Sequence, residues 1–67
     1  MAKQTAEVQF LRLQQVRDIT QLSKSSIYRL MSEGDFPRQI PLTARQVVWV
    51  KQHVMDWCNK KVKAAMA

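Results

Sequence analysis

The chain of 67 residues has very few of the residues on which several protein classes depend. Cys58 is its only cysteine, which excludes an intramolecular disulfide and a cysteine pair at metal-binding spacing. Gly34 is its only glycine and His53 its only histidine, so a glycine-rich phosphate loop and a histidine pair are also excluded. No apolar run approaches the length of a membrane span. We therefore expect no enzyme, no cofactor and no metal site, and a location in the cytoplasm.

Positive charge, by contrast, is abundant. The chain carries 11 Lys and Arg residues against 5 Asp and Glu residues, a formal net charge of +6. Such an excess attracts polyanions, either nucleic acid or an anionic membrane surface. The positive residues are not gathered on one amphipathic helix, which disfavours the membrane surface. The composition favours nucleic acid as the partner of a single small domain, and the helix pattern described next makes double-stranded DNA the expected partner.

The most informative segment covers residues 22–34. Ser23 can cap the start of a helix, and Gly34 can end it in the left-handed conformation. Ile27, Leu30 and Met31 follow the spacing i, i+3, i+4 and so share one apolar face. The remaining side chains are donors suited to phosphates and base edges: Lys24, Ser25, Ser26, Tyr28 and Arg29. This pattern is typical of the recognition helix of a helix-turn-helix.

The rest of the chain supplies the other parts of a winged helix, an α+β fold. The patterns predict a short strand within residues 9–13, a helix over 14–20, the recognition helix over 24–33, two strands around a loop at 43–46, and a helix over 51–63. Pro41 lacks an N–H, so its strand should lie at an edge of the sheet. We expect a flexible N-terminus over residues 1–8, the domain over 9–63 and a tail over 64–67. The predicted core consists of Val16, Ile19, Leu22, Ile27, Leu30, Phe36, Leu42, Trp49, Val54 and Trp57.

These segments together resemble the AlpA-like group of small phage transcriptional regulators, which is related to MerR-type DNA-binding domains and to several phage excisionases. The resemblance is carried by Phe10-Leu11-Arg12-Leu13, by residues 22–30, by Gly34-Asp35-Phe36-Pro37-Arg38, and by Val48-Trp49-Val50 with Val54 and Trp57. It implies a winged helix with helix 24–33 in the major groove and hairpin 38–50 as the wing.

Two positions depart from the pattern of that family. Glycine is usual in the turn between the two helices, and here the residue is Gln21. Either Gln21 is left-handed, at a cost of roughly 1 kcal/mol, or the turn has another shape. The wing tip of the family is often glycine-rich, whereas this chain has Thr43-Ala44, which leaves the turn type open.

The predicted DNA contacts each have a second reading. Arg29 can pair with guanine through two hydrogen bonds or hold a phosphate. Tyr28 can reach a phosphate, or its ring can stack on Arg29 or the wing. Arg38 and Arg45 can straddle a narrow minor groove or simply keep the hairpin soluble. The complete predicted DNA-binding set is Lys24, Ser25, Ser26, Tyr28, Arg29, Arg38 and Arg45.

Three functions compete. The first is a sequence-specific transcriptional regulator of phage or mobile-element type, acting as a dimer or on repeated sites. The second is an excisionase that bends DNA and assists an integrase, with the basic segment Lys60-Lys61-Val62-Lys63 near a neighbouring protein. The third is a protein-interaction module that binds no DNA.

Overall fold

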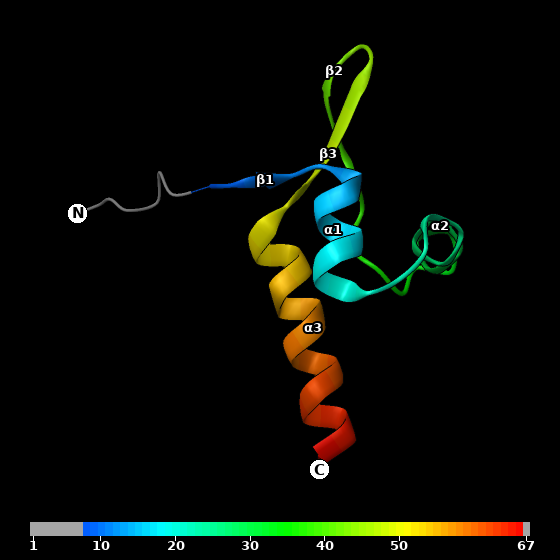
Figure 1. The fold of residues 1–67 in the computed structure, drawn as a ribbon, viewed down its shortest axis with the longest axis vertical. Helices are drawn as coiled ribbons and strands as arrows, with labels where there is room; N and C mark the ends of the chain where they lie inside the picture. The colour runs from blue at the N-terminus through cyan, green and yellow to red at the C-terminus, as the bar shows by residue number, and fades with distance from the viewer. Residues whose placement is uncertain (1–7, 67) are drawn as a thin grey trace, which may run out of the picture.

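The protein is described by a computed structural model covering residues 8–66, and its elements form an α+β winged helix (Figure 1). In chain order they are β1 (Phe10–Leu11), α1 (Leu13–Thr20), α2 (Lys24–Ser32), β2 (Ile40–Thr43), β3 (Gln46–Val50) and α3 (Lys51–Met66). The predicted fold class is confirmed. The first strand is shorter than predicted because α1 already begins at Leu13, and α3 continues beyond the predicted end at residue 63. The flexible N-terminus predicted for residues 1–8 lies, except for Val8, outside the described residues.

The three strands form one antiparallel sheet in the order β1-β3-β2. Leu11 pairs with Trp49 in β1 and β3, and Ile40 pairs with Val48 in β2 and β3. Pro41 therefore lies in an edge strand, as predicted from its missing N–H. The sheet joins the first residues of the domain to the wing through the shared strand β3.

The wing tip is a two-residue turn formed by Ala44 and Arg45, with Thr43 paired to Gln46. Hairpin turns of this length usually need positive φ angles, but neither turn residue has one. The register shifts between Pro41 and Thr43, so Leu42 is an extra residue in a β-bulge. A bulge increases the local right-handed twist, which offsets the splaying that an ordinary turn causes. The chain thereby forms the tight turn at the wing tip without glycine.

The core is built around Trp49, which is fully buried. Its buried neighbours in the same cluster are Leu11, Val16, Ile27, Phe36 and Val54, and half-buried Leu22, Leu30, Met31 and Trp57 pack against it. Two predicted core residues are wrong, because Ile19 is 38% exposed and Leu42 is 46% exposed. Ile19 is three residues after Val16 but lies in the last turn of α1, where Thr20 is the more buried residue, and Leu42 is the bulged residue of β2.

An edge-to-face aromatic contact holds the loop that follows α2 against α3. The rings of Phe36 and Trp57 meet edge to face with centroids 4.9 Å apart. Trp57 Nε1 donates a hydrogen bond of 2.7 Å to the Asp35 backbone oxygen, and Lys61 Nζ lies 5.3 Å from the centroid of the Trp57 ring. The loop and the middle of α3 are therefore held together, and Lys61 of the basic segment 60–63 is part of the fold.

Candidate nucleic-acid interface

The turn between α1 and α2 resolves the first departure noted in the sequence. Gln21 has φ 63° and ψ 20°, the left-handed conformation. Its backbone N–H donates to the Arg17 oxygen at 2.7 Å, and its side-chain Nε2 donates to the Asp18 oxygen at 2.7 Å. These bonds close the end of α1 and offset part of the strain of a non-glycine residue. The left-handed conformation of Gln21 thus sets the direction in which the chain leaves α1.

Both ends of α2 are closed as predicted. The Ser23 hydroxyl accepts a hydrogen bond of 3.1 Å from the Ser26 backbone N–H. At the other end Gly34 has φ 74°, the Gly34 N–H donates to the Met31 oxygen at 3.0 Å, and the Asp35 N–H donates to the Leu30 oxygen at 2.8 Å. This pair of bonds is a Schellman motif. Because the Ser26 N–H and the Leu30 and Met31 oxygens have local partners, α2 has sharply defined ends.

The apolar face of α2 holds the helix against the core. Ile27 is fully buried, and Leu30 and Met31 are half-buried against the core cluster. The opposite face is exposed at Lys24, Ser25, Tyr28 and Arg29, whereas Ser26 is half-buried and its hydroxyl accepts a bond from the Ser23 hydroxyl at 3.0 Å. In Figure 1, α2 stands out at one side of the body formed by α1, β3 and α3. Four of the five side chains predicted on this helix therefore face solvent together.

Arg29 does not stand alone on that surface. Its Nη1 lies 3.5 Å from Glu33 Oε2, one helical turn further along. Both side chains are more than half exposed, so this pair contributes little to stability. A nucleic acid can therefore replace Glu33 as the partner of Arg29 at little cost.

Tyr28 connects α2 to the sheet. Its ring lies edge to face against Trp49, with centroids 6.3 Å apart, and it remains partly exposed. Trp49 Nε1 in turn donates to the Pro37 oxygen at 3.2 Å, in the loop that leads to the wing. Two ring contacts were considered for Tyr28, one with Arg29 and one with the wing. The structure shows the contact with the wing, at Trp49 of β3. This contact sets the position of α2 relative to the hairpin.

The two predicted wing arginines occupy different parts of the hairpin. Arg45 lies in the turn at its tip, and Arg38 lies in the loop before β2. Both side chains belong to exposed residues. The structure therefore separates them along the length of the wing instead of placing them side by side.

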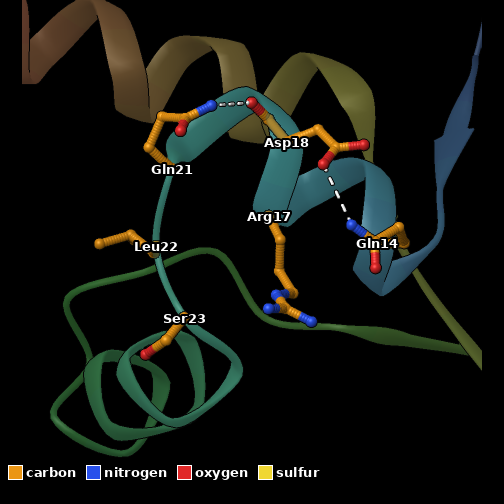
Figure 2. A pocket seen from close by; sticks show the side chains of 6 residues that line it. All are labelled: Gln14, Arg17, Asp18, Gln21, Leu22 and Ser23. Carbon is orange, nitrogen blue, oxygen red and sulfur yellow. Dashed lines mark hydrogen bonds between the residues drawn. The ribbon is translucent and has the colours of Figure 1, made fainter.

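A cleft between α1 and the start of α2 contains a residue that the sequence reading missed. Its lining consists of Gln14, Arg17, Asp18, Gln21, Leu22 and Ser23 (Figure 2). Figure 2 shows the Arg17 side chain leaving α1 toward the loop that follows α2, away from Asp18. The four polar residues from Gln14 to Gln21 follow the spacing i, i+3, i+4, i+7, which marks one helix face. That spacing was a signal available in the sequence.

A family comparison decides the broader identity of the chain. Residues 9–62 match the model of the family described as the prophage CP4-57 regulatory protein, AlpA. The chain belongs to the AlpA family. The predicted resemblance is thereby confirmed, and this AlpA-family chain is a member of a group of phage regulatory proteins.

A curated phage protein is also similar. The AlpA-family chain is 39% identical over 53 residues to the uncharacterized protein ORF88 of Enterobacteria phage P4. The aligned region covers 79% of this chain and 60% of that relative, so the chain spans less than two thirds of the phage protein.

Among residues 8–66, no three His, Cys, Asp or Glu side chains gather as a metal-binding group. None of the helices in this part of the chain is long and apolar enough to cross a membrane.

Proposed function

We propose that this AlpA-family chain is a sequence-specific regulator that binds double-stranded DNA, with α2 in the major groove and the β2–β3 hairpin as a wing. The observation that carries the proposal is the two-sided character of α2. One side is buried through Ile27, and the other presents Lys24, Ser25, Tyr28 and Arg29 to solvent in a chain of net charge +6. A helix with closed ends and an exposed donor face suits insertion into the major groove.

The proposed contacts divide into two kinds. Arg29 reads a guanine through its planar fork, while Lys24 and Ser25, in the first turn of α2, hold phosphates. Ser26 is less suited to a direct contact than the other four, because its hydroxyl already bonds to Ser23. Arg45 contacts the backbone or minor groove from the wing tip, and Arg38 does so nearer the wing base.

One copy of such a domain reads only a few base pairs. Useful specificity therefore requires two copies or repeated adjacent sites, and we propose binding of this kind. The role places the protein in the cytoplasm, where the target DNA lies.

The exposed wing also suits a second function, that of an excisionase that bends DNA for an integrase. Figure 1 shows the hairpin projecting from one end of the molecule and α3 from the other. A wing that grips flanking DNA favours deformation of the duplex, and the exposed lysines Lys60 and Lys63 then face a neighbouring protomer or an integrase.

Capture of genomic fragments tests the proposal. Sheared DNA from the source genome is incubated with the purified protein at near-physiological salt, and the retained fragments are sequenced. Discrete sites near a promoter support the regulator, and clustered repeats at the ends of an integrated element support the excisionase. Uniform recovery that vanishes as salt rises indicates binding by charge alone and contradicts both. Retention of no DNA favours the protein-interaction module.

A further inference from the structure

We propose that Arg17 anchors a DNA phosphate at the cleft between α1 and α2, and so fixes the angle at which α2 meets the groove. The inference rests on the proposed DNA binding and adds a residue outside the predicted set. It assigns to α1 a part of the interface that the exposed face of α2 does not supply. Arg17 is an exposed residue that lines this cleft, as does Ser23, the N-cap of α2.

The other polar groups of the cleft are already engaged within the protein. Gln14 Nε2 donates to Asp18 Oδ1 at 3.0 Å, and Gln21 Nε2 donates to the Asp18 backbone oxygen at 2.7 Å. The Ser23 hydroxyl accepts the capping bond from the Ser26 N–H. Among the lining residues, Arg17 is thus the one cation, and Figure 2 draws no hydrogen bond to its guanidinium.

Arg17 is also free of competing acids in the described part of the chain. The two ion pairs formed among residues 8–66 are Arg29 with Glu33 and Lys61 with Asp35. Asp18 follows Arg17 directly, but neighbouring helical residues diverge, and Figure 2 shows their side chains pointing in different directions. The Asp18 carboxylate is turned toward Gln14 instead. The guanidinium is therefore available to an external anion.

A phosphate suits this position better than a base edge. Arg17 lies on α1, and the first helix of a helix-turn-helix crosses the DNA backbone while the second helix reaches the bases. The planar guanidinium matches two phosphate oxygens with two N–H donors, which holds orientation as well as charge. Arg17 thus positions the recognition helix without reading sequence.

The test compares Arg17→Ala with Lys51→Ala on two duplexes, one recovered by genomic capture and one of scrambled sequence. Lys51→Ala removes the same charge from an exposed position at the start of α3. Affinities are measured by fluorescence anisotropy between about 50 mM and about 200 mM salt. Arg17→Lys keeps the charge without the planar fork, and far-UV circular dichroism checks that each variant is folded.

For Arg17→Ala we expect a loss of about three- to tenfold on both duplexes, and a salt slope that is smaller by about 0.9, the value of one phosphate contact. Lys51→Ala should leave the slope close to that of the wild type, and Arg17→Lys should retain most of the slope with weaker binding. An Arg17→Ala variant with the wild-type slope overturns the inference. A loss confined to the captured duplex also overturns it, because it would make Arg17 a base contact.

A modified duplex locates the contact. Replacing single phosphates by neutral methylphosphonates along the captured site should reveal one position where the wild type loses affinity and Arg17→Ala does not. Equal further losses in both proteins at every position contradict the assignment. Wild-type protein that binds neither duplex would refute the proposed function itself, whereas normal binding with an unaffected Arg17→Ala variant refutes only this inference.

Discussion

The α1–turn–α2 unit and the β2–β3 hairpin keep their shapes by different means. In the helical unit, bonds within a few residues fix each change of direction, at left-handed Gln21, at the Ser23 cap and at the Gly34 end of α2. Hairpin geometry instead depends on pairing with β3 and on a bulge at Leu42. The helices are thus specified mainly by local sequence, and the wing mainly by its attachment to the core.

That difference suits the two proposed tasks. A helix that reads bases must present its donors in one orientation, which local closure of both ends provides. A wing that contacts the backbone or minor groove needs less precision, and its exposed tip carries a single arginine, Arg45. The regions meet at Trp49, which contacts Tyr28 of α2 and bonds to the loop that leads to the wing.

The largest effect should come from removing that meeting point. Trp49→Ala should lower the free energy of unfolding by about 3–5 kcal/mol, because it empties a fully buried site. A core of this size supplies only about 3–5 kcal/mol in total, so the variant should be largely unfolded. Thermal melting followed by circular dichroism measures this. A cooperative transition at the wild-type temperature would show that the two regions do not depend on Trp49.

Changes at the left-handed positions should have intermediate and opposite effects. Gly34→Ala should destabilise by about 1–2 kcal/mol through strain alone, since an added Cβ would meet no atom within 4 Å. Gln21→Gly should stabilise by less than about 1 kcal/mol, because glycine accepts φ 63° but loses the bond from Gln21 Nε2 to the Asp18 oxygen. Urea unfolding of both variants gives the values. A neutral Gly34→Ala, or a Gln21→Gly that destabilises by a similar amount, would contradict the local account of the helical unit.

Loss of the cap should be slightly smaller. Ser23→Ala should cost about 1 kcal/mol, because the Ser26 N–H loses its acceptor. Ser25→Ala is the matched control, since Ser25 is exposed and its hydroxyl takes no part in the capping bond between Ser23 and Ser26. Its unfolding free energy should stay within about 0.5 kcal/mol of the wild type. Equal urea midpoints for the two variants would show that the Ser23 cap does not stabilise the protein.

The smallest effect on stability is expected at the wing tip. Arg45→Ala should change the free energy of unfolding by less than about 0.5 kcal/mol, because the residue is exposed in a turn. Its DNA affinity should fall on every sequence, with a salt slope smaller by about 1. Anisotropy titrations at several salt concentrations check this. An unchanged slope would mean that the wing tip does not touch DNA.

The helical unit was also the part that the sequence predicted best. Capping residues and i, i+3, i+4 spacing are local signals, so the ends of α2 and the inward position of Ile27 could be predicted directly. Burial in the sheet could not, because it depends on which strands pair. Leu11 is buried because it lies opposite Trp49, and Val48 because it sits in the central strand, and both were missed.

The candidate site shows the same division. The exposed donors of α2 could be predicted from a helical wheel, but the cleft at Arg17 needs the turn at Gln21 to bring α2 beside α1. The half-buried state of Ser26, whose hydroxyl bonds to Ser23, was likewise not predicted. The elements themselves could be predicted from the sequence better than the contacts between them.

The central claim is that α2 reads DNA sequence while the wing contributes contacts that do not. The most direct test measures the affinity of Arg29→Ala and Arg45→Ala for the captured duplex and for its scrambled counterpart at one salt concentration. Arg29→Ala should lose about 1–3 kcal/mol on the captured duplex and little on the scrambled one. Arg45→Ala should weaken both equally. Equal losses on the two duplexes for Arg29→Ala would contradict the claim and make Arg29 a phosphate contact.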